Sequence, residues 1–377
     1  MTNEAPRDQI DNLSEQAQLV IQRTIELTRI PAPTGEESDR AKHVERWWNE
    51  DGVTDVSFDE VGNIWGCAVS GDGPAVIVAA HLDTVFSRDI EHVTRREGTR
   101  LYGPGVGDDT VAVAALSVLG RMLADSSLRS PVWLVATVGE EGLGNLRGAN
   151  WALEHAPCPV DAFIAVEGNY LGRIGAKAVG SLRWNVEVRG PGGHAWEAAS
   201  APSAVDIAAR MVAAIGNVSV EAGSRSLNVG TFAGGEAVNA RAQRATFMID
   251  IRALDPEAID QLEAECRAIV MAPQVDGVEV SIDEIGRRPA GSIDEHHSLV
   301  RAALDALALG GLSSEMIASS TDANAAHPRG IPGVALGVTY GSGEHTAEEW
   351  IDLDFIGAGL RALADTVIGY VRKVENV

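Results

Sequence analysis

The sequence lacks several features that would place it in a class at once. Three cysteines occur in 377 residues (Cys67, Cys158 and Cys266), and their spacing fits neither a disulfide framework nor a zinc or redox motif. The longest apolar runs have only the length of strands, so we expect no segment that spans a membrane and no membrane partner. The first residues are polar and acidic, unlike a secretory signal. These absences together predict a cytoplasmic protein without structural disulfides.

Positive charge is also scarce. The chain has 54 Asp and Glu residues against 30 Lys and Arg residues, which gives a net charge of -24. Such an acidic surface repels phosphate backbones, so we expect no nucleic-acid partner. The hydrophobic content of 45% is ordinary for a globular protein. The length exceeds that of one typical domain and favours two.

Apolar segments alternate with amphipathic segments along most of the chain. Near-continuous apolar strands of this kind are typical of a sheet that is buried on both faces. We therefore predict an α/β fold with a mixed, mostly parallel sheet and helices on both faces. The spacing of apolar residues predicts helices over 13–29, 110–123 and 353–371, and a capping-box pattern at 34–37 predicts the start of another.

The middle of the chain follows a different pattern. Its segments alternate apolar and polar residues in the order β-α-β-β-α-β, which is typical of a ferredoxin-like α+β unit. One of its helices begins at Asp255-Pro256, a cap followed by proline at the first helical position. Turns bound this insert at residues 179–291. We therefore expect a catalytic domain in two parts, 1–178 and 292–377, around an inserted domain.

Side chains that commonly bind metals follow four of the apolar segments. In chain order these are His81, Glu140, Glu141, Glu167 and His345. Each alone is more often a surface residue than a ligand. Ligands of open α/β sheets bind at the carboxyl ends of strands, so four strand ends would deliver these side chains to one edge. Agreement among four strands makes coincidence the weaker explanation.

Two adjacent acids, Asp108 and Asp109, stand between a glycine-rich turn and an apolar helix. One aspartate at such a place caps the helix, but two like charges without a basic neighbour require another explanation. Mixed imidazole and carboxylate ligands suit zinc, cobalt or manganese better than calcium or magnesium. The ligands are too many for one tetrahedral ion. Two ions that share a bridging carboxylate, about 3.5–4 Å apart, would use them economically.

At this point a family resemblance becomes visible. The motifs HLDTV, GPGVGDD, GEEGLG, AVEG, GPGGHAW, STDAN, GIP and GEHTAEEW occur along the chain in this order. In that order they resemble the dinuclear-zinc family of aminoacylases, glutamate carboxypeptidase, acetylornithine deacetylase and peptidase T. The resemblance spans nearly the whole chain. It implies a zinc-exopeptidase-like catalytic domain, and it implies that the insert is a lid and dimerisation domain of a homodimer.

The resemblance also implies which residues hold the ions. His81 and Glu167 would bind one divalent ion, Glu141 and His345 would bind the other, and Asp108 would bridge both. Zinc is the expected metal, with cobalt and manganese as alternatives. Asp109 would then help to cap or orient the following helix, or would support the metal ligands without binding the ions itself.

Further roles follow from the same resemblance. Asp83 would orient the imidazole of His81. Glu140 would be the general base that takes a proton from the metal-activated bridging water and passes it to the leaving nitrogen. By itself, His194 in GPGGHAW would count as a loop histidine, whereas the resemblance makes it an oxyanion-stabilising residue that often serves the partner subunit.

Substrate contacts are implied at four further positions. Asn239 and Arg252 match positions in the insert that commonly contact substrate. Thr321 and Asp322 in STDAN match a substrate-side loop, or else they only cap the next helix.

We therefore expect a hydrolase that cleaves one amide bond in a short peptide or an N-acyl amino acid. One alternative is an amidase or aminohydrolase that acts on a non-peptide C–N bond. Another is a non-catalytic binding homologue, which the intact ligand set makes a weaker explanation. The pair Thr110-Val111 after the two aspartates departs from the Lys-Gly of many family members, and its consequence for specificity stays open.

Overall fold

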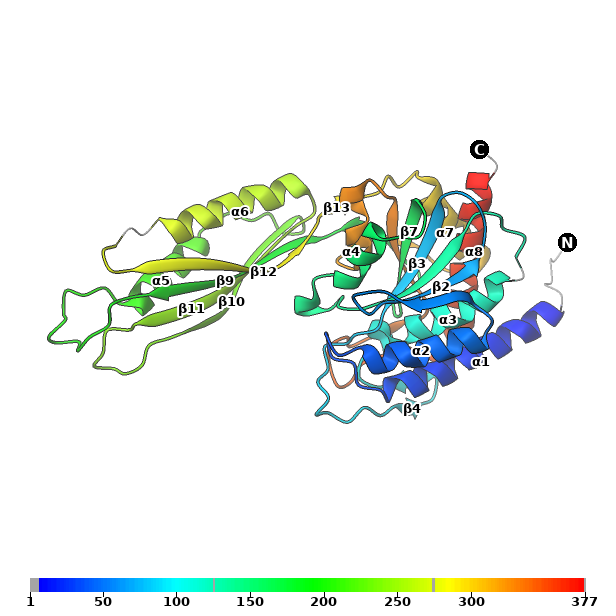
Figure 1. The fold of residues 1–377 in the computed structure, drawn as a ribbon, viewed down its shortest axis with the longest axis horizontal. Coiled ribbons are helices and arrows are strands. Elements are labelled where there is room, and N and C mark those ends of the chain that lie inside the picture. Colours follow the sequence, from blue (N-terminus) through cyan, green and yellow to red (C-terminus); the bar gives the residue numbers. More distant parts are fainter. Residues whose placement is uncertain (1–6, 125, 273–274, 376–377) are drawn as a thin grey trace. The chain divides into compact units, whose positions relative to one another are not determined.

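The structure is a computed structural model that describes residues 7–124, 126–272 and 275–375. The chain forms two compact units (Figure 1). The first, here called the main unit, contains Met1–Ala178 and Ser292–Val377. The second, here called the insert unit, contains Val179–Gly291.

A nine-stranded sheet is the centre of the main unit. Its strand order is β1-β2-β6-β3-β7-β15-β8-β13, and β14 pairs with β8. The middle strands β6, β3, β7 and β15 are parallel neighbours, whereas β1, β2 and β6 pair antiparallel, as do β15 and β8. The predicted mixed, mostly parallel sheet is therefore confirmed. The strands are β1 (Thr54–Phe58), β2 (Ile64–Val69), β3 (Ala75–His81), β6 (Val132–Thr137), β7 (Val160–Glu167), β8 (Arg173–Ala178), β13 (Gly291–Ser292), β14 (Glu315–Ser319) and β15 (Gly333–Gly337).

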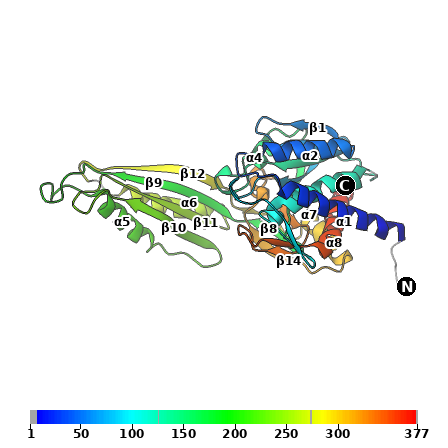
Figure 2. The same ribbon diagram turned by 90° about the horizontal axis from the view of Figure 1, so that it is seen from below.

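Both faces of this sheet are buried. Along β3, Val76 and Val78 belong to one hydrophobic core, and Ile77 and Ala79 belong to another on the opposite face. This alternation explains why the strand sequences are apolar at nearly every position. The first core includes residues of five helices, α1 (Arg7–Thr28), α2 (Ser38–Glu50), α3 (Val111–Ala124), α7 (Ser298–Leu309) and α8 (Ile356–Glu375), and α1 packs against α3 and α8 (Figure 2). The second core includes residues of α4 (Arg147–Glu154) and η3 (Asp322–Ala325).

The insert unit is a four-stranded antiparallel sheet with two helices and a hydrophobic core of its own. The element order is β9 (Gly180–Arg189), α5 (Ala204–Ile215), β10 (Arg225–Gly234), β11 (Arg244–Ala253), α6 (Pro256–Met271) and β12 (Glu279–Arg288). This is the predicted β-α-β-β-α-β order, and the sheet order is β10-β11-β9-β12. Helix α6 begins as predicted, because the Asp255 carboxylate accepts a hydrogen bond from the Ala258 amide at 3.0 Å.

Two local features differ from the sequence-based expectation. The capping box predicted at 34–37 is wrong, since α2 begins at Ser38 without a side-chain cap. Thr34 instead donates to Asp83 at 2.9 Å, and Glu37 accepts from the amide of Gly139 at 3.1 Å. The second feature is a small antiparallel sheet that was not predicted from the sequence. Its short strands are β4 (Arg95–Glu97), β5 (Arg100–Tyr102), β16 (Gly341–Ser342) and β17 (Trp350–Asp352).

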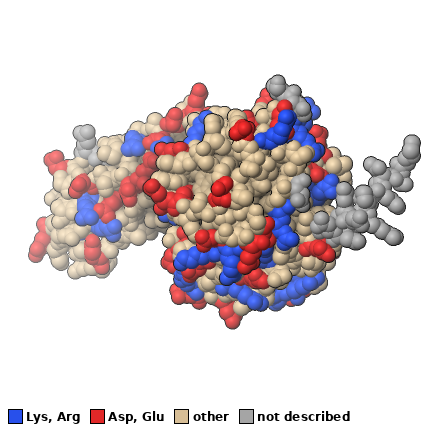
Figure 3. Space-filling model, turned by 45° about the vertical axis from the view of Figure 1, so that its right-hand side comes forward, with Lys and Arg blue, Asp and Glu red and all other residues tan. Residues whose placement is uncertain are grey.

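The surface carries both signs of charge. On the face shown in Figure 3, acidic side chains are spread widely and Lys and Arg side chains lie among them. Among the described residues, no helix combines the length and the apolar character that crossing a membrane would require.

Candidate metal centre

Parallel strands bring the predicted ligands to one edge of the main sheet. His81 is the last residue of β3 and Glu167 is the last residue of β7. Glu140 and Glu141 follow the end of β6, which is the other neighbour of β3. Because these three strands run in the same direction, their carboxyl ends lie together. Asp108 arrives on the short turn η1 (Val106–Thr110), and its peptide bond to the next residue is cis.

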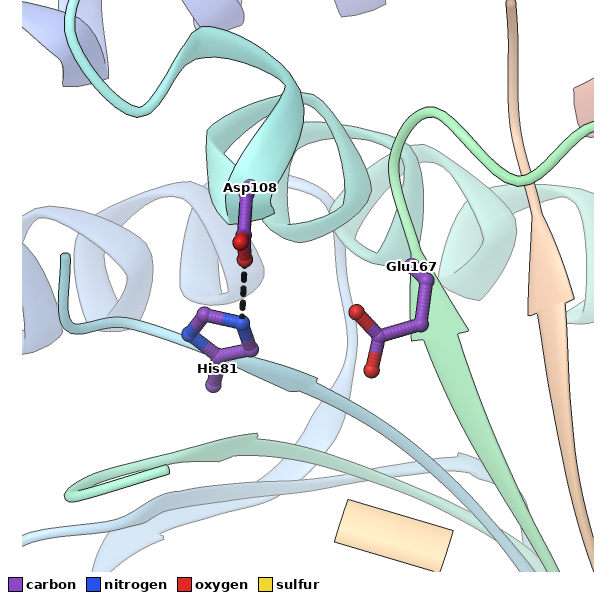
Figure 4. A group of neighbouring side chains, drawn as sticks. All are labelled: His81, Asp108 and Glu167. Atoms are coloured by element: carbon purple, nitrogen blue, oxygen red, sulfur yellow. Dashed lines mark hydrogen bonds and ion pairs between the residues drawn. The ribbon is translucent and has the colours of Figure 1, made fainter. Parts of the chain in front are cut away.

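The two carboxylate oxygens of Asp108 face two different histidines. Its Oδ1 lies 2.9 Å from Nε2 of His81, and its Oδ2 lies 3.1 Å from Nε2 of His345. The same nitrogen of His345 lies 3.1 Å from Oε1 of Glu141. In Figure 4, the imidazole of His81 points toward Asp108, and the Glu167 carboxylate turns toward the same space. Asp108 therefore stands between two groups of side chains.

These side chains form two sets of potential ligands with Asp108 in common. One set is His81, Asp108 and Glu167, and the other is Asp108, Glu141 and His345. Within each set the ligand atoms lie within 4.8 Å of one another. Glu140 forms a third such group with His81 and Glu141, again with the ligand atoms within 4.8 Å of one another, and its role as a base stays a prediction. One imidazole and two carboxylates per set fit a divalent transition metal.

Charge is concentrated in this buried cluster. Burial alone would lower the pKa of His81, but Asp109, Asp108 and Asp83 raise that pKa well above its ordinary value. Burial raises the pKa of Glu167 well above its ordinary value, and the neighbouring carboxylates add to this effect. Carboxylates thus outnumber the two imidazoles that could neutralise them. A group of buried like charges is stable with cations at its centre, which supports the fit of metal ions.

Asp83, which follows β3, acts mainly on the loop of Glu140 and Glu141. The fully buried carboxylate of Asp83 accepts hydrogen bonds from the amides of Glu140 at 3.0 Å and Glu141 at 2.9 Å. Nδ1 of His81 lies closer to the backbone oxygen of Asp83, at 3.0 Å, than to its carboxylate, at 3.7 Å. The backbone of Asp83 therefore contacts the imidazole while its side chain fixes the neighbouring strand end.

Asp109 joins two ligand-bearing strands. Its carboxylate accepts a hydrogen bond from the amide of His81 at 3.1 Å and another from the amide of Gly168, next to Glu167, at 2.8 Å. Burial raises the pKa of Asp109 well above its ordinary value. Of the two roles that the sequence left open for this residue, the structure favours support of the candidate ligands, because its side chain holds the ends of β3 and β7.

Thr110, which replaces the lysine of many family members, contacts a buried arginine. Thr110 is fully buried, and its hydroxyl accepts a hydrogen bond from the guanidinium of Arg40 at 3.2 Å. Arg40 also donates to the backbone oxygens of Leu82 at 3.0 Å and Ile30 at 2.7 Å. Burial lowers the pKa of Arg40 to about 10, so it stays cationic at neutral pH. Thr110 therefore belongs to the support beneath the site.

Sequence analysis missed a second supporting residue, Glu349. Its buried carboxylate accepts hydrogen bonds from the turn that carries Asp108. Burial raises the pKa of Glu349 to about 7, although the hydrogen bonds from the amides of Asp108, Gly107 and Gly105 oppose the shift. Its position in the sequence could have identified it. Glu349 directly precedes the short strand β17, and an acid that becomes buried there needs a polar partner.

The insert unit brings together two of its three predicted site residues. The amide of Ala195, next to His194, donates to the backbone oxygen of Asn239 at 2.8 Å, and both side chains are exposed. Arg252 lies at the opposite end of the sheet, paired with Ser181 in the ladder and hydrogen-bonded to Asp250 at 2.7 Å. The substrate contacts of all three residues stay predictions.

Thr321 and Asp322 are both buried in the main unit. The Thr321 hydroxyl caps η3 by accepting from the amide of Ala323 at 3.2 Å, and Asp322 accepts from Thr137 at 2.5 Å. Thr321 therefore caps the next helix, which was one of the two predicted roles. A substrate role for either residue stays a prediction.

Comparison with known proteins identifies the family of this chain. The sequence model of Peptidase family M20/M25/M40 matches residues 77–368 of this chain. A putative LysW-lysine/LysW-ornithine hydrolase of Aeropyrum pernix is 31% identical over 257 residues, which cover 67% of this chain and 68% of that protein. A probable carboxypeptidase of Ajellomyces dermatitidis is 25% identical over 300 residues, which cover 71% and 68% of the two chains.

A solved structure extends the similarity to the whole fold. The tripeptidase of Staphylococcus aureus subsp. aureus Mu50 superposes with a TM-score of 0.78 at 24% identity, covering 96% of this chain and 99% of that one. Because the family match covers most of the chain, including every strand end of the candidate centre, it extends well beyond a shared fold. The chain belongs to Peptidase family M20/M25/M40, and it is a hydrolase that acts on peptide or amide bonds.

Proposed function

We propose that this protein is a dinuclear metallohydrolase that cleaves one amide bond in a short peptide or an N-acyl amino acid. The observation that carries the proposal is the placement of Asp108, whose two oxygens face His81 at 2.9 Å and His345 at 3.1 Å. A carboxylate that bridges two ions presents one oxygen to each. His81 and Glu167 would complete one site, and Glu141 and His345 would complete the other.

Zinc is the metal that this ligand chemistry favours, with cobalt and manganese as alternatives. Each site would combine one imidazole nitrogen with carboxylate oxygens, a set common to zinc hydrolases and unlike the all-oxygen sites of calcium or magnesium. When bound, the ions would lower the pKa of a water molecule and polarise the scissile carbonyl.

Glu140 would move the proton. Its backbone amide is fixed by the Asp83 carboxylate at 3.0 Å, and the residue is buried beside the ligands His81 and Glu141. A carboxylate held there can accept the proton of the attacking water and deliver it to the leaving nitrogen. Asp83 would therefore act by positioning Glu140 and Glu141 as well as His81.

The insert unit would complete the substrate site. His194 and Asn239 share one exposed loop region, where an imidazole and an amide could stabilise the oxyanion and bind the substrate. Arg252 would bind a carboxylate of the substrate. The insert would also serve as the dimerisation domain of a homodimer, and the three free cysteines fit a cytoplasmic enzyme.

The experiment that tests this proposal joins metal analysis with a substrate panel. The panel contains dipeptides, tripeptides, N-acyl amino acids and aromatic amides, and it is run with the wild type and with Glu140→Ala. Exposed Glu154 provides the matched control, Glu154→Ala. We expect two ions per chain in all three proteins. Glu140→Ala should lower kcat by about 10²–10⁴-fold, and Glu154→Ala should not.

Each contrary result removes a different part of the proposal. Fewer than two ions per chain under zinc-replete conditions would contradict the dinuclear centre. Full turnover by Glu140→Ala would remove it as the base. Hydrolysis confined to the aromatic amides would favour the amidase alternative over the peptidase. A monomeric mass from light scattering would remove the dimer.

A further inference from the structure

A buried glutamate holds the turn that carries Asp108. The Glu349 side chain is fully buried. Its Oε1 accepts hydrogen bonds from the amides of Gly107 at 2.7 Å and Asp108 at 2.8 Å, and its Oε2 accepts from the amide of Gly105 at 3.0 Å. One carboxylate therefore satisfies three backbone donors within four residues of a turn that lies more than two hundred residues away in sequence.

The turn needs such a partner because it lacks a cap of its own. Gly105, the residue that precedes the turn at its cap position, has φ of 65° and no side chain that could accept a hydrogen bond there. The first amides of a helical turn have no partner within the turn, and leaving them unpaired in the interior destabilises the fold. Glu349 supplies the missing acceptor from outside the turn.

Glu349 is also tied to His345. The amide of Thr346 donates to Gly343 at 3.1 Å, and the amide of Glu349 donates to Thr346 at 3.3 Å, so 343–349 forms a tight turn. The His345 imidazole touches the Asp108 side chain at 3.1 Å, while Glu349 binds the Asp108 amide. One short segment thus contacts Asp108 at both its side chain and its backbone.

The other half of the site has a different support. The amide of His81 and the amide beside Glu167 both donate to Asp109. These contacts hold the strand ends of His81 and Glu167 without involving the 343–349 turn, so within this set only the shared Asp108 depends on Glu349. Loss of Glu349 would therefore loosen the set of Asp108, Glu141 and His345 more than its neighbour.

We propose that Glu349 is a positioning residue that sets the separation of Asp108 and His345 and thereby the affinity of one of the two metal sites. This inference rests on the proposed dinuclear function. Partners that orient metal ligands typically change metal affinity by about 10–100-fold when they are replaced. We expect a loss of that size at the site of Glu141 and His345, and a smaller loss at the site of His81 and Glu167.

Metal binding to Glu349→Gln tests the inference without relying on activity. The amide keeps one acceptor oxygen but turns an NH₂ group toward the N–H donors. Manganese is titrated into metal-free protein, and electron paramagnetic resonance follows free Mn²⁺ and the signal of exchange-coupled pairs. Wild type should bind two ions and give the coupled signal, whereas Glu349→Gln should bind its second ion about 10–100-fold more weakly. Anomalous scattering from zinc-soaked crystals should show reduced occupancy beside His345.

The neighbouring Glu348→Gln is the matched control, because the Glu348 side chain is 77% exposed and pairs with Arg95, which is itself half exposed. It should behave as wild type. Gly107→Ala reaches the same contact from the other side, since a Cβ there would lie 3.2 Å from Oε1 of Glu349. It should weaken the same ion, and it serves as the test if Glu349→Gln does not fold.

The outcomes separate the two proposals. Fewer than two ions in the wild type would overturn the dinuclear function and this inference with it. Two ions in the wild type and in Glu349→Gln, with equal affinities and the same coupled signal, would overturn the positioning role alone. A lower Tm of Glu349→Gln with unchanged manganese affinities would also overturn it, because a purely structural role predicts that result.

Discussion

The main unit and the insert unit differ in how they hold most of their candidate site residues. In the main unit, the His345 side chain is exposed, but His81, Glu141 and Glu167 are buried. The amides of His81 and Glu141, and the amide that follows Glu167, donate hydrogen bonds to buried carboxylates. In the insert unit, His194 and Asn239 are exposed on a loop. The difference indicates a division of labour. A metal site requires ligands fixed to within fractions of an ångström, whereas a substrate-binding loop must admit and release a ligand.

Removing the shared ligand should have the largest effect. Asp108→Ala deletes the oxygens that face both histidines, so we expect loss of metal at both sites and of all activity. Asp109→Ala removes backbone contacts but no ligand, so it should bind metal more weakly and retain part of its content. Elemental analysis after dialysis measures both. Equal, mild losses in the two variants would contradict the bridging assignment.

Removing the insert histidine should reduce turnover but leave the metal centre intact. His194→Ala should lower kcat by about 10²–10³-fold, the usual effect of losing one oxyanion donor, with two ions still bound. Kinetics and elemental analysis of the same sample provide the measurement. A mixed dimer of His194→Ala and Glu140→Ala chains should regain part of the activity if His194 serves the partner. Metal loss in His194→Ala would break the division between the units.

Core substitutions should separate the stabilities of the two units. Phe247 and Phe163 are both fully buried, one in the insert core and one beneath the main sheet. Each change to Ala should cost about 3–5 kcal/mol of unfolding free energy in its own unit. Phe247→Ala should leave manganese affinity unchanged, whereas Phe163→Ala should reduce it. Denaturant melts and metal titrations check this pair, and equal effects on metal binding would show that the units are energetically coupled.

The smallest effect expected is a pH dependence of metal binding. Hydrogen bonds to Asp108 and Glu141 raise the pKa of His345 to about 10 in the metal-free protein. Below a pH of about 10, a metal ion must therefore displace a proton from Nε2 of His345. The metal affinity of this site is then expected to increase as the pH rises toward that pKa. The expected slope is about tenfold per pH unit for each proton displaced. Zinc titrations against a competing chelator from pH 6 to 8 measure it, and a flat profile would exclude His345 as a ligand.

Much of this architecture could be predicted because it depends on local patterns. The apolar runs of β3, β6 and β7 predicted a sheet buried on both faces, and Asp255-Pro256 predicted the start of α6. The metal-binding candidates could be predicted because parallel strands collect their carboxyl ends at one edge. The capping box at Thr34 failed because Asp83, distant in sequence, binds the same hydroxyl.

The sequence by itself determined which residues can bind metal and on which strand ends they stand, since both follow from residue type and periodicity. Only the tertiary structure decided how those residues are held. Glu349, Asp109 and Arg40 are ordinary charged residues in the sequence, and their roles depend on which backbone groups lie within hydrogen-bonding distance after folding. Such contacts join segments far apart along the chain, and no local pattern specifies them.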